Sequence, residues 1–96
     1  MKLLQVKRAN DGTHKYTAVF DDGKEVKFGA IKPNGTPYSD FTQHKDEARK
    51  ERYLDRHRKN ENWNDVQSPG ALSRWILWNK PTLKESIADF KKRFNL

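Results

Sequence analysis

The chain has 96 residues, and 20 Lys and Arg against 13 Asp and Glu give it a formal net charge of +7. Domains commonly contain roughly 100–150 residues, so residues 1–96 are expected to form a single domain. The absence of cysteine excludes disulfides, thiol catalysis and cysteine-ligated metal centres. No apolar stretch approaches the ~18 residues of a membrane span or forms a signal peptide. We therefore expect a soluble protein that is neither membrane-bound nor secreted.

Only 33% of the residues are hydrophobic, a composition that makes disorder a serious alternative. Three Trp, three Tyr and five Phe argue against it, because they recur at regular spacing. Each large ring can bury about 150–250 Å², so a few of them suffice for a small core. The sequence therefore predicts a folded protein with an aromatic core and a heavily charged surface.

The first 31 residues show the alternation of three short β-strands, over 4–7, 16–20 and 25–30. Asn10-Asp11-Gly12 and Asp22-Gly23 between them favour tight turns. Every second residue in these runs is apolar: Leu4 and Val6, then Tyr16, Ala18 and Phe20, then Val26, Phe28 and Ala30. This pattern predicts an antiparallel β-meander with one apolar face that other elements must cover.

Residues 42–96, which follow a loop at 32–40, are expected to form three helices that cover this face. The first, about 42–59, is highly charged, and the second, about 69–78, starts after Ser68 as N-cap with Pro69 in its first position. The third starts at a capping box formed by Thr82 and Glu85. The predicted fold is α+β, with this core: Phe20, Val26, Phe28, Tyr53, Leu72, Trp75, Ile76, Ile87, Phe90 and Phe94.

A row of basic residues on the 42–59 helix is the main functional signal. At 100° per residue these cations share one narrow sector: Lys45, Arg49, Arg52, Arg56 and Lys59. Such a row suits phosphate binding, because cations displace counterions from a polyanion. The acidic residues Glu47, Glu51 and Asp55 occupy an adjacent sector, and Tyr53, Leu54 and His57 are expected roughly opposite the basic row. The alternative is a solvated face with i,i+4 pairs of Asp46 with Lys50 and of Asp55 with Lys59.

Other residues could extend or complement this surface. Lys91, Lys92 and Arg93 are expected to lie alongside the row, and Arg74 either joins it or makes a cation–π contact with a Trp. Trp75 and Trp78 have the spacing of core residues. Tyr38 and Trp63 lie in polar connectors, where each could pin its loop, stack on a base or contact a second subunit.

The sequence offers no convergent set of catalytic groups. His14, His44 and His57 lack metal-ligand spacing. Asp22 with Glu25 and Lys27 faintly resembles the acidic-plus-lysine pattern of metal-dependent nucleases, but it also fits a hairpin with charged outer positions. We therefore predict a non-enzymatic protein without cofactor or metal.

Four segments of the chain form a distinctive set. The most specific is Leu72-Ser73-Arg74-Trp75-Ile76-Leu77-Trp78-Asn79-Lys80-Pro81, and the others are Phe41-Thr42-Gln43-His44-Lys45-Asp46-Glu47, the 49–59 segment and Asp89-Phe90-Lys91-Lys92-Arg93-Phe94. Over about residues 25–96 the chain thereby resembles a family of small basic proteins encoded by large nucleocytoplasmic DNA viruses. The resemblance implies a viral product acting near viral or host DNA, in the virion or in the nucleus or cytoplasm of an infected cell. The family has no established catalytic residues, so the resemblance assigns no site.

These observations favour a nucleic-acid-binding protein, with double-stranded DNA as target, little sequence preference, and RNA as an alternative. The expected phosphate contacts are Lys45, Arg49, Arg52, Arg56 and Lys59, assisted by Lys91, Lys92 and Arg93. A second hypothesis is a protein-interaction module or homodimeric virion protein, in which the acidic and basic strips pair reciprocally. A metal-dependent nuclease is the remote third.

Overall fold

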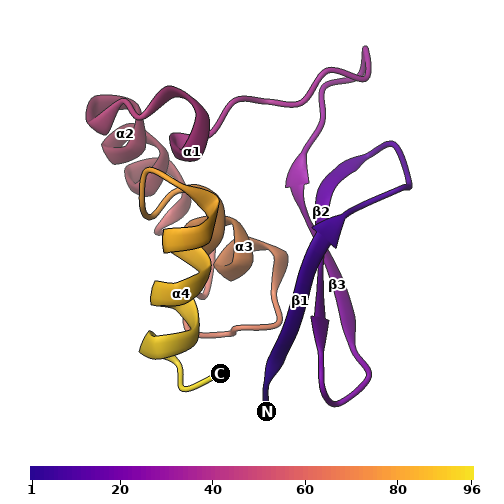
Figure 1. The fold of residues 1–96 in the computed structure, drawn as a ribbon. Helices are drawn as coiled ribbons and strands as arrows, with labels where there is room; N and C mark the ends of the chain where they lie inside the picture. Colours follow the sequence, from indigo (N-terminus) through magenta and orange to yellow (C-terminus); the bar gives the residue numbers. More distant parts are fainter.

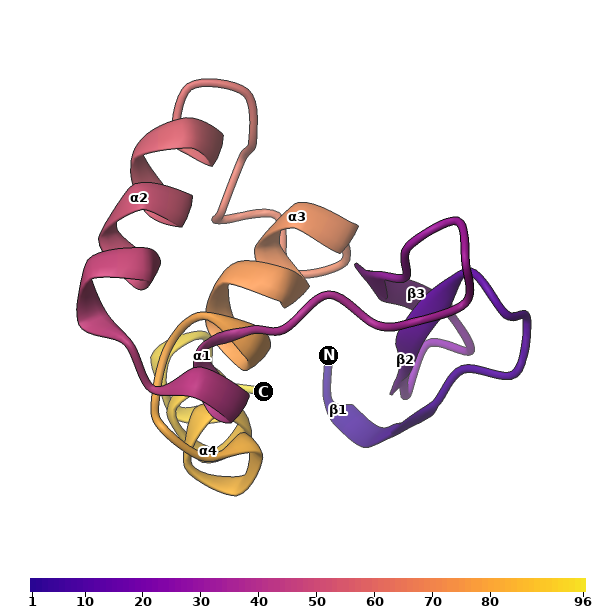
Figure 2. The same ribbon diagram turned by 90° about the horizontal axis from the view of Figure 1, so that it is seen from above.

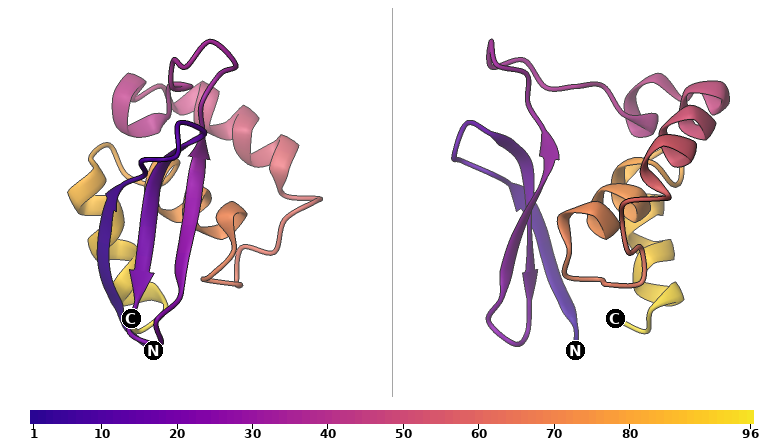
Figure 3. Two further views of the ribbon diagram at one scale, coloured as in Figure 1. Left: turned by 90° about the vertical axis from the view of Figure 1, so that its right-hand side faces the viewer. Right: turned by 180° about the vertical axis from the view of Figure 1, so that it is seen from behind.

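The computed structural model describes residues 1–96 as a three-stranded sheet with helices packed on one face (Figure 1). The antiparallel strands β1 (Leu3–Arg8), β2 (His14–Phe20) and β3 (Glu25–Ala30) lie in the order β1-β2-β3. The two further views in Figure 3 show all helices on the same side of the sheet. The predicted α+β fold with a β-meander is therefore confirmed. None of the helices has the length and apolar character needed to cross a membrane.

One strand departs from the predicted alternation. A bulge between Leu3 and Gln5 shifts the register, so that Leu3 pairs with Phe20 and Val6 pairs with Ala18. Leu3 is buried and Leu4 is 62% exposed. The prediction that Leu4 faces the core is wrong, because the extra residue in a bulge places side chains three positions apart on the same face.

The predicted 42–59 helix is divided into α1 (Phe41–His44) and α2 (Glu47–His57). Asp40 caps α1, and the Asp46 carboxylate accepts hydrogen bonds from the first amides of α2. Between the helices Lys45 adopts a left-handed conformation with φ 55°. The break follows from two consecutive caps, since a residue cannot both cap a new helix and continue the previous one.

The remaining helices are α3 (Pro69–Leu72), the π-helical segment η1 (Ser73–Leu77) and α4 (Leu83–Arg93). Ser68 caps α3 as predicted, by accepting a hydrogen bond from the Ala71 amide. At the start of α4 the Thr82 hydroxyl accepts from the Glu85 amide at 3.1 Å. A capping box predicts that the Glu85 carboxylate accepts from a backbone amide. In the structure it accepts from the Thr82 hydroxyl instead.

The main core lies between the sheet, α3, η1 and α4. Of the ten predicted core residues, seven are buried: Phe20, Val26, Phe28, Tyr53, Leu72, Ile76 and Phe90. Trp75, Ile87 and Phe94 pack at its edge and are partly exposed. The prediction missed several buried residues, among them Leu3, Phe41, Leu54, Leu77 and Leu96. Figure 2 shows α3 between the sheet and α2, so α3 faces the sheet on one side and α2 on the other.

Candidate functional site

Helix α2 carries three of the five residues of the predicted basic row, namely Arg49, Arg52 and Arg56. All three are exposed, and we call them the arginine row. Lys45 lies in the break before α2, where its Nζ donates to the Thr42 carbonyl at 3.3 Å. Lys59 follows the end of the helix. The prediction of five cations along one helix is therefore wrong at both ends, because the helix is shorter than predicted.

The arginine row lines a cleft of about 510 Å³, and we call it the arginine cleft. Figure 2 shows the elements around it: α2, α3 and the segment that leads from β3 into α1. Tyr53 and His57 line the same cleft, so the expectation that they lie opposite the arginines is wrong. At 100° per residue only Leu54 is truly opposite, whereas Tyr53 is four positions after Arg49 and shares its side of the helix.

The two carboxylates of the arginine cleft are already engaged by groups other than the arginine row. Asp40 accepts from the Lys15 ammonium at 2.6 Å, and the two side chains are 5% and 8% exposed. Glu61 accepts from the Trp63 indole N–H at 3.0 Å, and its other oxygen lies 3.0 Å from His57 Nδ1. Neither carboxylate forms an ion pair with an arginine of the row, so the three guanidinium charges have no carboxylate in contact with them.

The arginine row has almost no partners within the protein. Arg49 Nη2 donates to Ser39 Oγ at 3.2 Å and so joins α2 to the segment before α1. Arg52 and Arg56 form neither a side-chain hydrogen bond nor an ion pair. Their guanidinium groups keep all their donors for an external acceptor, and the planar fork suits a phosphate or carboxylate.

A stack of three rings forms one wall of the arginine cleft. The Tyr53 ring lies 4.2 Å from the His57 ring and 4.3 Å from the Trp78 ring, centroid to centroid. Both faces of the Tyr53 ring are therefore covered. Burial also raises the pKa of the Tyr53 hydroxyl well above its usual range, so this hydroxyl stays neutral. This stack joins α2 to Trp78, the residue that directly follows η1.

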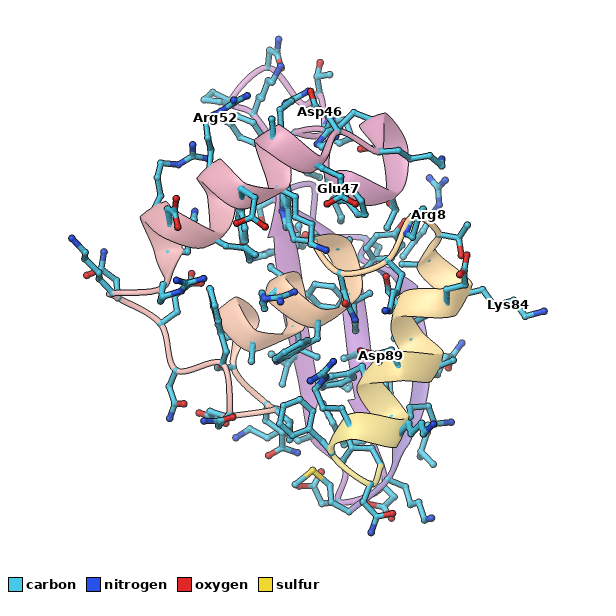
Figure 4. All side chains as sticks on the ribbon, turned by 90° about the vertical axis from the view of Figure 1, so that its left-hand side faces the viewer. Arg8, Asp46, Glu47, Arg52, Lys84 and Asp89 are labelled. Carbon is cyan, nitrogen blue, oxygen red and sulfur yellow. The ribbon has the colours of Figure 1, made fainter.

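Charge pairing within α2 does not explain its acidic residues. Asp46 caps the helix, and Lys50 Nζ donates to the Asn79 carbonyl at 2.8 Å and lies 4.8 Å from the Phe41 ring centroid. Neither of the two i,i+4 pairs considered from the sequence is present. Glu47, Glu51 and Asp55 are exposed and unpaired. Figure 4 shows Glu47 and Arg52 leaving α2 on different sides.

The second predicted basic cluster, Lys91 to Arg93, lies at the carboxyl end of α4. Figures 1 and 3 place this end beside the chain terminus, at the opposite end of the molecule from α1. The expectation that these residues lie alongside the arginine row is therefore wrong, because α4 crosses the helical layer in another direction. Arg93 instead pairs with Asp89 at 3.4 Å.

An alternating series of arginine and tryptophan side chains connects α4 with the end of α2. The Arg93 and Arg74 guanidinium groups lie 4.4 and 4.2 Å from the Trp75 ring centroid. Arg74 and Arg58 lie 5.3 and 6.0 Å from that of Trp63. The cation–π interpretation of Arg74 is confirmed, and Trp63 pins its loop to the body of the protein. These cations are engaged in packing, unlike those of the arginine row.

The structure gives no grouping that resembles a metal centre. No three His, Cys, Asp or Glu residues lie close enough together to hold an ion. In the hairpin, Glu25 lies 3.8 Å from Lys7 and Lys27 lies 3.5 Å from Asp11. The Asp22 carboxylate accepts from the Gln67 side chain at 3.0 Å. These contacts agree with the alternative interpretation of a hairpin with charged outer positions.

Comparison with known proteins places the chain in a family. The model described as "Family of unknown function (DUF5754)" matches residues 4–57, more than half of the chain. The chain belongs to DUF5754. The match spans the β-meander, the segment before α1 and the whole arginine row, whereas α3, η1 and α4 lie outside it. No curated protein and no solved structure matches the chain.

Proposed function

We propose that this DUF5754 protein binds nucleic acid without catalysing a reaction, with double-stranded DNA as target and little sequence preference. The observation that carries the proposal is the arginine row: Arg49, Arg52 and Arg56 lie on one exposed side of α2 without a carboxylate partner. Unpaired cations suit a polyanion, because phosphate contacts release condensed counterions. A location in the virion or in an infected cell rests on the viral resemblance alone.

The spacing of the arginine row suits a phosphate backbone. A rise of about 1.5 Å per residue separates Arg49 from Arg56 by about 10 Å along α2. Phosphates of one DNA strand follow at about 3.4 Å along the duplex axis, so a row laid parallel to that axis covers about three phosphate steps. Contacts of this kind position a protein on a duplex without reading bases, which is why we propose little sequence preference.

The test replaces Arg49, Arg52 and Arg56 together with Gln and measures affinity for a labelled duplex by fluorescence anisotropy across a salt series. Each lost phosphate contact should lower the slope of log K against log salt by about one unit, so the triple variant should lose up to about three. Lys84→Gln is the single-charge control, since Figure 4 shows Lys84 at the start of α4 pointing away from α2. Its affinity and slope should stay close to wild type.

Two further measurements complete the experiment. Lys91→Gln combined with Lys92→Gln reports whether the α4 cluster assists, and it spares the packed Arg93. Unrelated duplexes of equal length, and duplex RNA, report sequence preference and the choice between DNA and RNA. An unchanged salt slope in the triple variant, with circular dichroism showing an intact fold, would refute the proposal.

A second candidate function is homodimerisation through reciprocal charge pairing. It is favoured by the exposed and unpaired acidic residues of α2, Glu47, Glu51 and Asp55, which accompany the arginine row on the same helix. Sedimentation velocity with and without DNA separates the two candidates. A salt-sensitive complex with DNA supports nucleic-acid binding, and a dimer that forms without DNA and ignores it supports the interaction module.

A further inference from the structure

The arginine cleft contains an exposed aromatic ring that contacts with a phosphate backbone would not use. Tyr38 lines the cleft from the segment between β3 and α1, across from α2. It is 49% exposed, and it is the one aromatic among the exposed large hydrophobic residues, the others being Met1 and Leu4. Tyr38 stacks on no other aromatic ring of the protein, and it shares the cleft with the arginine row.

The backbone around Tyr38 holds the ring in place. Its amide donates to the Ala30 carbonyl at 3.3 Å, and Ile31 forms an isolated β-bridge with Pro37. The next residue, Ser39, accepts the hydrogen bond from Arg49, and Asp40 caps α1. The Tyr38 ring is therefore carried by an anchored segment that is tied directly to the arginine row.

Of the two tyrosines that line the cleft, Tyr38 is the one with an accessible ring. Both faces of Tyr53 are covered by His57 and Trp78. Lys32 Nζ lies over the Tyr38 ring, 5.5 Å from its centroid, so this cation occupies one face of the ring and a base would stack on the other face. A flat ring with free cations across a cleft is the arrangement that binds a base together with its phosphate, since bases stack on aromatic side chains and phosphates pair with arginine.

We infer that the arginine cleft binds a nucleotide, with its base stacked on Tyr38 and its phosphate held by Arg52 and Arg56. The volume of about 510 Å³ falls within the roughly 300–1,000 Å³ typical of small-molecule sites. The nucleotide is either free or an unpaired residue of a single strand, because bases stacked inside a duplex cannot reach Tyr38. This inference rests on the same arginines as the proposed function and adds a ligand class to it.

The test compares a labelled single strand with a labelled duplex of the same sequence by fluorescence anisotropy, using Tyr38→Ala and Tyr38→Phe. Loss of a stacking ring should weaken single-strand binding about tenfold in Tyr38→Ala. Tyr38→Phe keeps the ring and should bind like wild type. Duplex affinity should be the same in all three proteins, and Arg52→Gln with Arg56→Gln should weaken single-strand and duplex binding alike. Because Tyr38 is exposed, these variants should fold normally.

Competition with unlabelled AMP identifies the source of the nucleotide. Displacement of the single strand by AMP supports a site for free nucleotides, and Tyr38-dependent strand binding without displacement supports an unpaired nucleotide of a strand. The inference is overturned if neither AMP nor the single strand binds, or if Tyr38→Ala leaves strand affinity unchanged or lowers strand and duplex affinity equally. Duplex binding that ignores the arginines, together with Tyr38-dependent AMP binding, would instead refute only the proposed function.

Discussion

The buried ion pair between Lys15 and Asp40 should be the most sensitive polar contact of the fold. It joins β2 to the N-cap of α1, with an N–O distance of 2.6 Å and side chains that are 8% and 5% exposed. Lys15→Met keeps the aliphatic stem and leaves the Asp40 carboxylate buried without its cation. Removing one partner of a buried pair costs about 3–5 kcal/mol. Asp40 retains hydrogen bonds from the Thr42 amide and hydroxyl, so we expect the lower end, about 3 kcal/mol.

Such a loss is large for a chain of this size. Typical stabilities of 0.05–0.15 kcal/mol per residue give about 5–14 kcal/mol for the whole protein. Urea unfolding followed by circular dichroism should show a midpoint lower by about 2 M, at an m-value of about 1.5 kcal/mol/M. The exposed pair of Lys7 with Glu25 is the matched control, since Lys7→Met should cost no more than about 1 kcal/mol.

A double-mutant cycle isolates the pair from the capping role of Asp40. Asp40→Asn retains an oxygen that can cap α1 and removes the charge, so Lys15→Met combined with Asp40→Asn should destabilise less than the sum of the two single variants. A cost below about 1 kcal/mol for Lys15→Met, or additive effects in the cycle, would contradict the reasoning that the pair is buried and coupled.

Three further predictions concern stability. Gly29→Ala should cost about 2–3 kcal/mol in urea unfolding, because φ is +84° and the added Cβ would lie only 2.9 Å from Lys15 Cβ and 3.2 Å from Leu77 Cδ1. Gly12→Ala also has a positive φ but nothing within 4 Å, so it should cost about 1 kcal/mol, and equal costs for the two variants would contradict the clash. Phe90→Ala should cost about 3–5 kcal/mol, since the side chain is fully buried in the core, and a cost near 1 kcal/mol would refute its central place. Burial lowers the pKa of His44, so the folded state favours the neutral ring. The stability that this preference contributes is fully present above about pH 6.5 and is lost as the pH falls toward the folded pKa. His44→Gln should therefore flatten the plot of unfolding free energy against pH between pH 7 and 5.

Much of the local structure was predictable because it depends on neighbours in the chain. Alternating apolar residues and the Asp22-Gly23 turn predicted the meander, and Ser68 and Thr82 predicted where helices begin. The break before α2 also had a local signal that was overlooked: Asp46 precedes Glu47 and a helical run, as an N-cap does. The bulge in β1 has no such local signal, since the register depends on how Leu3 and Val6 pair with β2.

The sequence by itself determined that the charge excess contains an arginine row on one side of α2, because helical periodicity alone fixes which of its residues share a side. Only the tertiary structure decided that this row faces a cleft, that Tyr38 lies across it, and that Asp40 and Glu61 are bound to other partners. These features join residues from separate elements, such as Lys15 with Asp40 and Arg49 with Ser39. Their contacts depend on how helices pack on the sheet, which spacing along the chain does not encode.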